Sequence, residues 1–382
     1  MSPTVSPKHI LLLFSDTGGG HRSAAEAIIE ALGIEYGEAV TTEMVDIFKD
    51  YAPLPFSRMP DWYPYMVKFP KLWGLSFKAT NTRVATRAIN TSVRPLVTRT
   101  VRNIVRNHPS DIIVSVHPVG AKPILRVLGP SHPPFITVVT DMVSTHSFWF
   151  DKRSDLILVP TDMAREKAIK NHIPPEKVIV VGQPVALRYC VPGGEKNTLR
   201  KKLGWKGEKV TVLLVGGGEG MGPIARTAYA IDGSGLDVSL VIVAGRNARL
   251  KAKLESHAWS IPTVIYGFTR EMPDFMRAAD VLVTKAGPGT IAEALNASLP
   301  IILYARLPGQ EDGNVTYVTG VGAGVWAPTA KKVVNTLREW VSRPDEYQKA
   351  VEACRRAARP DASRNIARAI GKMLKLPQPE AK

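Results

Sequence analysis

The chain has 382 residues, of which 45% are hydrophobic, and it carries a formal net charge of +16 at neutral pH. This length exceeds one small core and is typical of two globular domains. The positive charge predicts an anionic partner, which nucleic acid, an anionic membrane or a phosphorylated small molecule would each supply. Cys190 and Cys354 lie in no metal or redox spacing, which argues against structural zinc and fits a reducing compartment. No stretch approaches the roughly 20 apolar residues that cross a bilayer, so we expect any membrane contact to be peripheral.

Short apolar runs alternate with helical patterns along the chain, which is typical of parallel α/β units. A first series of strands is expected at residues 9–15, 111–117, 135–141 and 156–161. A second series is expected at residues 209–215, 239–244, 263–266, 281–284 and 301–304. The proline- and glycine-containing stretch 182–207 predicts a linker. We therefore expect a domain at residues 1–185, a domain at residues 186–360, and a C-terminal helix and tail at residues 361–382. Two doubly wound domains would place ligands at the C-terminal ends of their strands, in the cleft between them.

Three glycine-rich stretches each follow a predicted strand and precede a helix. They are residues 15–22 (Ser-Asp-Thr-Gly-Gly-Gly-His-Arg, with Gly19 and Gly20), residues 216–220 (Gly-Gly-Gly-Glu-Gly, with Gly217) and residues 285–290 (Lys-Ala-Gly-Pro-Gly-Thr). Such glycines let the backbone approach a ligand, and the following helix offers free N–H groups, although any single stretch is equally compatible with a plain tight turn. Together they favour a phosphate ligand. None matches the dinucleotide or ATP phosphate-loop pattern, so neither NAD nor ATP hydrolysis is indicated.

Two polar clusters follow in the second half of the chain. Thr290 and Glu293 open the third helix, either as a capping pair or with the carboxylate positioned to accept ribose hydroxyls. Residues 308–314 read Pro-Gly-Gln-Glu-Asp-Gly-Asn, a mixed set of donors and acceptors that suits sugar hydroxyls but also an ordinary polar turn.

The motifs at residues 15–27 and 284–294 resemble those of the monogalactosyldiacylglycerol synthase family. Residues 308–314 fit the same family, as do Ser-Val-His-Pro at 115–118 and Val-Thr-Asp at 139–141. The resemblance spans both domains, from about residue 9 to about residue 330. It implies an α/β fold of the GT-B type, with two Rossmann-like domains facing a cleft and a UDP-sugar held mainly by the C-terminal domain.

The resemblance also implies roles for individual residues. Gly287, Pro288, Gly289 and Thr290 would hold the diphosphate, and Glu293 the ribose. Gln310, Glu311 and Asn314 would contact the sugar and the nearby phosphate. Phe268 and Thr269 stand where the family contacts uracil, and His21 stands where its proposed catalytic base lies.

The chemistry of glycosyl transfer fits these residues. A neutral alcohol attacks the anomeric carbon as UDP leaves, so the reaction needs a base and stabilisation of the departing diphosphate. A histidine such as His21 suits the first task, and Asp16 is close enough in sequence to orient or charge it. The helix that begins at Gly289, helped by Arg246, suits the second task with no cofactor and no obligatory metal. The family resemblance implies inversion at the anomeric carbon. On the acceptor side His117, Asp141 and His146 are lesser candidates, individually better explained as structural.

Residues 58–106 differ in composition from the rest of the chain. Asp61 is their only acid, whereas the basic residues are Arg58, Lys68, Lys71, Lys78, Arg83, Arg87, Arg94, Arg99, Arg102 and Arg106. The apolar and aromatic residues between them include Trp62, Tyr63, Tyr65, Met66, Phe69, Leu72, Trp73, Leu75 and Phe77. This mixture is typical of a segment that lies in a bilayer interface. The alternatives are aromatic side chains packed in the core and a nucleic-acid surface; no nucleic-acid motif accompanies the segment, so no nucleic acid is expected as a partner.

The function that these features and the resemblance predict is transfer of galactose from UDP-galactose to diacylglycerol, by a peripheral enzyme on the cytoplasmic side of a membrane with anionic lipids. Two alternatives stay open: a diacylglycerol glucosyltransferase that uses UDP-glucose and is possibly processive, and a non-catalytic UDP-sugar-binding peripheral membrane protein.

Overall fold

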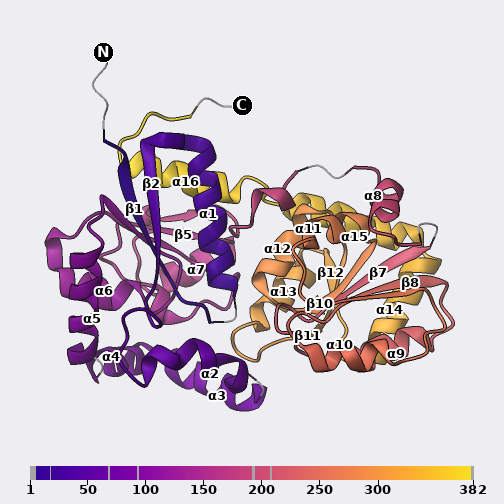
Figure 1. Ribbon diagram of the computed structural model, residues 1–382. Coiled ribbons are helices and arrows are strands. Elements are labelled where there is room, and N and C mark those ends of the chain that lie inside the picture. The colour runs from indigo at the N-terminus through magenta and orange to yellow at the C-terminus, as the bar shows by residue number, and fades with distance from the viewer. Residues whose placement is uncertain are drawn as a thin grey trace. The chain divides into compact units, whose positions relative to one another are not determined.

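The computed structural model describes residues 6–17, 19–67, 69–92, 94–191, 194–206 and 209–379 (Figure 1). The chain divides into two compact units. The first unit comprises Met1–Leu187, Pro308–Gln310 and Asp361–Lys382, and the second comprises Arg188–Leu307 and Glu311–Pro360. Each unit has its own six-stranded sheet. The C-terminal helix, which the sequence separates as a third segment, thus belongs to the first unit.

The sheet of the first unit is entirely parallel, in the order β2-β1-β3-β4-β5-β6. Its strands are β1 (Lys8–Phe14), β2 (Val40–Asp46), β3 (Ile112–Ser115), β4 (Phe135–Val138), β5 (Leu156–Val159) and β6 (Val178–Val180). The chain winds away from β1 in one direction to β2 and in the other direction from β3 onward. The loops after β1 and β3 therefore diverge, and a doubly wound sheet binds ligands at such a point.

Helices cover both faces of this sheet because side chains alternate along β1. Ile10 and Leu12 pack toward α1 (Gly20–Tyr36) and α16 (Ala362–Met373), which lie side by side in Figure 1. Leu11 and Leu13 pack toward α5 (Arg94–Asn107) and α6 (Ala121–Leu128) on the other face. The remaining helices of the unit are α2 (Met59–Met66), α3 (Pro70–Thr80), α4 (Arg83–Ser92) and α7 (Asp162–Lys170).

The second unit has a parallel sheet in the order β12-β11-β10-β7-β8-β9. Its strands are β7 (Val210–Val215), β8 (Val238–Val243), β9 (Thr263–Tyr266), β10 (Val281–Lys285), β11 (Ile301–Ala305) and β12 (Gly324–Trp326). The direction of winding reverses between β7 and β10, so the divergent loops are those after these two strands.

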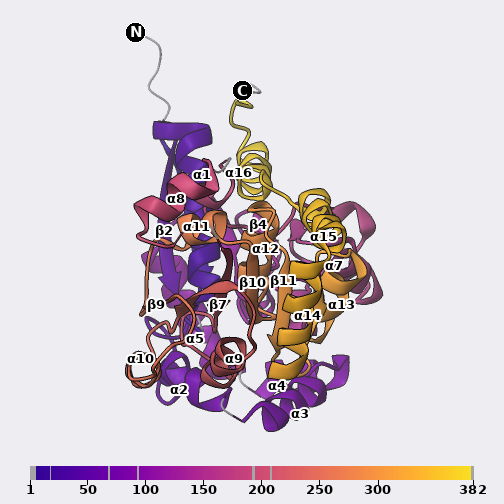
Figure 2. The same cartoon turned by 90° about the vertical axis from the view of Figure 1, so that its right-hand side faces the viewer.

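The helices of the second unit cover its sheet in the same way. They are α8 (Lys196–Lys202), α9 (Ile224–Asp232), α10 (Ala248–Glu255), α11 (Met272–Ala278), α12 (Pro288–Asn296), α13 (Asp312–Gly320), α14 (Ala330–Ser342) and α15 (Pro344–Ala357). Figure 2 shows α9 and α14 close together, and both pack into one core with β7, β8 and β11.

All nine strands expected from the sequence are present, which confirms the prediction of two doubly wound α/β sheets. Three strands of the described chain were not predicted: β2, β6 and β12. Each lies at the edge of its sheet. β2 contains the polar run Thr41–Glu43 and so is not a continuous apolar run, whereas β6 and β12 have only three residues each and are too short to stand out.

The C-terminal helix is tied to α1 by a buried carboxylate. The side chain of Glu35 is 2% exposed and accepts bonds from Arg364 at 2.6 Å and from Arg368 at 2.7 Å. Burial opposes ionisation, but the bonds from Arg368 and Arg364 outweigh it and hold the pKa of Glu35 below its ordinary value. The pair thus fixes α16 on the first unit rather than leaving it as a tail.

We predict that Glu35→Gln lowers the free energy of unfolding of the first unit by about 1–2 kcal/mol. Hydrogen bonds to charged groups contribute about 1.5–3 kcal/mol, and this value is reduced here because both guanidinium groups reach solvent. Urea unfolding followed by circular dichroism measures the change. The control is Glu38→Gln, because Glu38 is exposed just beyond α1. Equal stability of the two variants would contradict the anchoring role.

Candidate active site

The first part of the candidate site lies at the divergent loops after β1 and β3 in the first unit. Gly19, with a left-handed φ of 78°, precedes α1, and Gly20 is the first residue of that helix. His21 follows in its first turn and is half-buried. Its Nδ1 atom lies 2.9 Å from the carbonyl oxygen of Val116, just beyond β3, and 2.9 Å from the hydroxyl of Thr140, beyond β4.

These partners determine which nitrogen of His21 is basic. A carbonyl oxygen only accepts, so the hydrogen bond to Val116 requires Nδ1 to carry the proton. The lone pair of the neutral ring is then on Nε2. Burial lowers the pKa of His21 to about 4, although the hydrogen bond to Val116 acts in the opposite direction. The imidazole is therefore neutral at pH 7, in the form that accepts a proton.

His117 packs against this ring at a centroid distance of 4.7 Å, edge to face. Its Nδ1 accepts from the backbone N–H of Val119, and its Nε2 lies 3.4 Å from the hydroxyl of Thr17. Burial, followed by the charge of His21, lowers the pKa of His117 well below its ordinary value. The two neutral rings thus lie buried against each other, where a positive charge on either ring would be unfavourable.

The other predicted residues of this unit have defined partners. Asp16 accepts from Arg22 at 3.1 Å, while His21 is oriented by Val116 and Thr140. Asp141, 7% exposed, accepts from the indole N–H of Trp149 at 2.7 Å. His146 stacks on Phe148, contacts Phe77 edge to face, and caps the short helix that follows it. These contacts hold both side chains in place in the loop between β4 and β5.

The second part of the candidate site lies after β7 and β10 in the second unit. Gly217 turns the chain with a φ of +72°, and a Cβ at this position would lie 3.2 Å from the Cε of Lys285, the last residue of β10. A Cβ at Gly287 would lie 3.0 Å from the Nζ of the same lysine. A lysine ammonium is thus held beside both glycine turns.

Helix α12 presents its N-terminus at the same point. Its N-cap is Gly287, which offers no side-chain cap, and Pro288, Gly289 and Thr290 form the first turn. Thr290 is therefore the third residue of the helix rather than its cap. The N–H groups of this turn have no intrahelical partner and carry the positive end of the helix dipole, which suits an anion.

Glu293 lies one turn further along α12. Burial raises its pKa to about 7, while the charge of Arg188 and a hydrogen bond from the hydroxyl of Tyr189 act in the opposite direction. The hydroxyl of Tyr189 therefore orients this carboxyl. The capping alternative placed Thr290 near the N-cap, whereas Gly287 occupies that position.

The turn after β11 contains three predicted residues in different environments. Glu311 is 3% exposed, accepts from Lys285 at 2.7 Å and also accepts from the backbone N–H of Leu307 at 2.8 Å. Asn314 donates to the carbonyl of Ala286, and its buried Oδ1 has no hydrogen-bond partner among the residues that the structure describes. Gln310 belongs to the first unit, where its Nε2 lies 3.5 Å from Asp141.

Arg246 and Phe268 form a stacked pair after β8 and β9. The guanidinium lies 4.3 Å from the centroid of the Phe268 ring, which is 56% exposed. Arg246 also bonds Glu219 of the second glycine turn at 2.9 Å. Thr269 accepts from the backbone N–H of Glu271 and so fixes the loop that carries Phe268.

Sequence reasoning missed four residues of these two parts: Val116, Thr140, Tyr189 and Lys285. Val116 and Thr140 lie within the family-like stretches 115–118 and 139–141, but their contacts with His21 are not visible there, and no local pattern marks Tyr189. Lys285 did carry a signal, because a lysine directly precedes the third glycine motif.

The basic segment 58–106 forms α2 to α5, and α3 has two different apolar faces. Phe69, Leu72 and Leu75 are each about two-thirds exposed. In contrast, Trp73 is half-buried against Tyr63, and Phe77 contacts Gly309 and His146. Trp62 is 40% exposed and Lys71 is exposed, whereas Lys68 lies outside the described residues. The apolar surface offered to solvent thus comes mainly from residues other than the predicted Trp73 and Phe77.

In the described part of the chain, no three histidine, cysteine or acidic residues gather closely enough to hold a metal ion. Among its helices, none combines the length and apolar character needed to span a bilayer.

Both units match known protein families. Residues 21–185 match the monogalactosyldiacylglycerol (MGDG) synthase family, and residues 211–366 match the glycosyltransferase family 28 C-terminal domain. The chain is 37% identical to the chloroplastic monogalactosyldiacylglycerol synthase of Spinacia oleracea over 369 residues, which cover 94% of this chain and 71% of the spinach protein. It is 36% identical to monogalactosyldiacylglycerol synthase 1 of Arabidopsis thaliana, over 93% of this chain and 69% of that protein.

Solved structures share the fold at low sequence identity. A UDP complex of S. aureus MnaA superposes with a TM-score of 0.64 at 15% identity, covering 98% of this chain and all of that one. MurG of Acinetobacter baumannii gives a TM-score of 0.61 at 15% identity, covering 96% and 100%. These likenesses confirm the GT-B fold class. The identity to the spinach and Arabidopsis enzymes across both units shows that the chain belongs to the monogalactosyldiacylglycerol synthase family of hexosyltransferases.

Proposed function

We propose that this protein transfers galactose from UDP-galactose to diacylglycerol and yields a β-linked monogalactosyldiacylglycerol. The observation that carries the proposal is the neutral His21, whose Nδ1 is occupied by Val116 and whose Nε2 is the basic atom. Membership of the MGDG synthase family supports the choice of donor and acceptor.

In this proposal the second unit holds the UDP part of the donor. The first turn of α12 and Lys285 bind the diphosphate, and Arg246 supplements them. Glu293 accepts from the ribose hydroxyls, and the exposed ring of Phe268 offers a stacking surface to uracil. Gln310 and Asn314 are the candidates for the sugar hydroxyls. Helix dipole and lysine together offset the developing charge on UDP, so we propose a reaction that needs no cofactor and no obligatory metal.

The reaction follows as a single displacement. The hydroxyl of diacylglycerol attacks the anomeric carbon and passes its proton to the Nε2 of His21. The bond from this carbon to the UDP oxygen breaks, and UDP leaves with the electron pair. The Val116 carbonyl accepts from Nδ1–H throughout and stabilises the imidazolium that forms. Because attack and departure occur on opposite sides, one displacement inverts the anomeric centre.

The acceptor resides in a bilayer, so we propose that the enzyme is peripheral on the cytoplasmic side of a membrane that contains anionic lipids. The exposed apolar residues of α3 would enter the interface, and the surrounding basic residues would contact lipid phosphates. Each basic residue near an anionic surface adds about 1 kcal/mol of attraction, so a handful suffices for reversible docking.

An activity assay tests the function directly. Purified protein is incubated with diacylglycerol vesicles and labelled UDP-galactose or UDP-glucose, and the lipid product is identified by mass spectrometry and anomeric NMR. We expect β-monogalactosyldiacylglycerol. A glucosylated product would overturn the choice of donor sugar, several sugars per lipid would show processivity, and UDP binding without product would show a non-catalytic protein.

His21→Ala should lower kcat by about 10²–10⁴, the usual effect of removing a general base. The Kd for UDP should not change, because His21 belongs to the first unit. Steady-state kinetics and calorimetric titration measure the two quantities. His172→Asn is a matched control, since His172 is exposed and has a left-handed backbone that asparagine tolerates. If the His21 variant keeps its turnover within a few-fold, another group is the base.

Glu293→Ala should weaken UDP binding about 10- to 150-fold, because charge-assisted hydrogen bonds contribute about 1.5–3 kcal/mol. The pH dependence is a second signature. Burial raises the pKa of Glu293 to about 7, so the carboxylate is lost as the pH falls through that value and wild-type affinity should fall with it. Glu293→Gln should show no such dependence between pH 6 and 8 (roughly one unit either side of that pKa). Glu352→Ala, at an exposed position of α15, is the control. Unchanged UDP affinity in Glu293→Ala would refute the ribose assignment.

Membrane docking by α3 is tested with a variant that carries Phe69→Ser, Leu72→Ser, Leu75→Ser, Lys71→Glu and Lys78→Glu. We expect it to lose co-sedimentation with anionic vesicles while its UDP affinity is retained. Wild-type binding should weaken with salt, because the Debye length shrinks from about 10 Å at 0.1 M to about 3 Å at 1 M.

A control variant with Ile34→Ser, Lys331→Glu and Lys332→Glu changes exposed residues elsewhere and should sediment normally. Normal sedimentation of a folded α3 variant would place the membrane contact outside this helix.

A further inference from the structure

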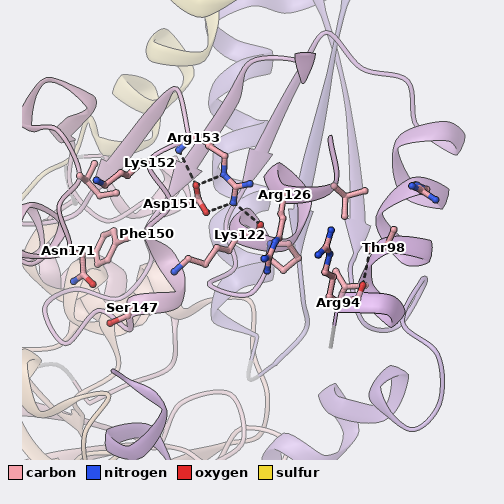
Figure 3. Close-up of a pocket in the computed structure, with 15 residues that line it drawn as sticks. Arg94, Thr98, Lys122, Arg126, Ser147, Phe150, Asp151, Lys152, Arg153 and Asn171 are labelled. Atoms are coloured by element: carbon pink, nitrogen blue, oxygen red, sulfur yellow. Dashed lines mark hydrogen bonds and ion pairs between the residues drawn. The ribbon is translucent and has the colours of Figure 1, made fainter. Parts of the chain in front are cut away.

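A cavity of about 710 Å³ lies in the first unit, among residues that have no part in the proposed reaction (Figure 3). Its walls come from α5, from α6 and from the segment that follows the short helix Ser147–Trp149. The lining residues include neither His21 nor any of the residues assigned to the donor. It is therefore a separate feature that needs its own explanation.

Six of the 15 lining residues are cationic. Each of the three elements contributes two: α5 contributes Arg94 and Arg102, α6 contributes Lys122 and Arg126, and the third segment contributes Lys152 and Arg153. Arg94, Thr98 and Arg102 are spaced by four residues, as are Lys122 and Arg126, so each helix presents one face to the cavity. Figure 3 shows side chains of all three elements around the same space.

One carboxylate lines the cavity within the described chain, that of Asp151. It is 7% exposed, and Arg153 donates to both of its oxygens, at 2.8 Å from Nε and 2.7 Å from Nη2. Asp151 thus offsets the positive charge of Arg153 and orients its guanidinium group. The remaining lining cations share this space with no further carboxylate among the lining residues.

The rest of the lining is suited to a ligand with a phosphate group. Phe150 and Ile173 are buried and form an apolar floor with Pro123. Guanidinium groups present paired N–H donors that match two phosphate oxygens, and several cations around one cavity repel one another unless an anion lies between them. The Lys122 charge also contributes, after burial, to lowering the pKa of the neighbouring His146 to about 4.

We propose that this cavity is a second anion site, which binds a phosphate group independently of the donor diphosphate. The phosphate is that of a small soluble ligand or that of a phospholipid headgroup, and the same cations recognise both. The proposal rests on the first unit alone and does not depend on which sugar is transferred.

The test uses the full chain with the donor site saturated by UDP, so that any further phosphate binding reports the second site. Inorganic phosphate is titrated by calorimetry into the wild type, into R102A/R126A and into a control variant K331A/K332A. The control loses the same charge from exposed positions of α14. We expect the R102A/R126A variant to bind phosphate at least 10-fold more weakly, a loss of about 1.4 kcal/mol, with UDP affinity and circular dichroism unchanged. R102K/R126K keeps the charges and should stay within a few-fold of the wild type.

A second arm distinguishes the sources. Co-sedimentation is measured with phosphatidylcholine vesicles that do or do not contain phosphatidylglycerol. Calorimetric binding that only R102A/R126A loses assigns a soluble phosphate ligand. Phosphatidylglycerol-dependent sedimentation that only R102A/R126A loses, without calorimetric binding, assigns a headgroup. If R102A/R126A and K331A/K332A behave alike in both arms, the proposal is overturned.

Discussion

The functional parts of this protein depend on one constraint of parallel sheets. When the chain winds outward in both directions from the middle of such a sheet, the loops after the two central strands diverge and leave their polar backbone groups accessible. The first unit has this reversal between β1 and β3, and the second has it between β7 and β10. The first brings together His21 and Val116; the second brings together Gly217, Lys285 and α12. Residues nearly 100 positions apart meet because the topology requires it.

The sequence predicted the parts of the fold that burial determines. Central strands such as β5 and β11 are continuous apolar runs because helices cover both of their faces. The edge strand β2 has three consecutive polar residues, and the edge strands β6 and β12 have only three residues each, so these strands gave a weaker signal. The glycine motifs were equally visible, because a positive φ such as that of Gly217 strongly favours glycine. Local sequence thus reveals constraints that act on one segment at a time.

The contacts within the site could not be predicted from local sequence, because they join segments that only the fold brings together. Asp16 is close to His21 in sequence, but its carboxylate accepts from Arg22, and the ring is oriented by Val116 and Thr140. Glu293 was visible as a carboxylate in a helix, whereas its orienting partner Tyr189 lies about 100 residues earlier. In α3, composition marked the aromatic residues without indicating which face they occupy. Phe77 packs inward, and Leu72 and Leu75 remain exposed.

In the proposed reaction, the cations of the second unit bind the diphosphate while each is also paired with a carboxylate. Lys285 and Arg246 flank the glycine turn at Gly217 and Gly218, and each is already paired, with Glu311 at 2.7 Å and with Glu219 at 2.9 Å. These pairs fix the two charges in position before a ligand arrives, which lowers the entropic cost of ordering long side chains. They also mean that a diphosphate must share each cation with a carboxylate. In the proposed reaction, the shared charge stabilises the leaving group while its negative charge develops, and the carboxylates limit how tightly the finished UDP is bound. A site that used unpaired lysines would bind the product more strongly and release it more slowly.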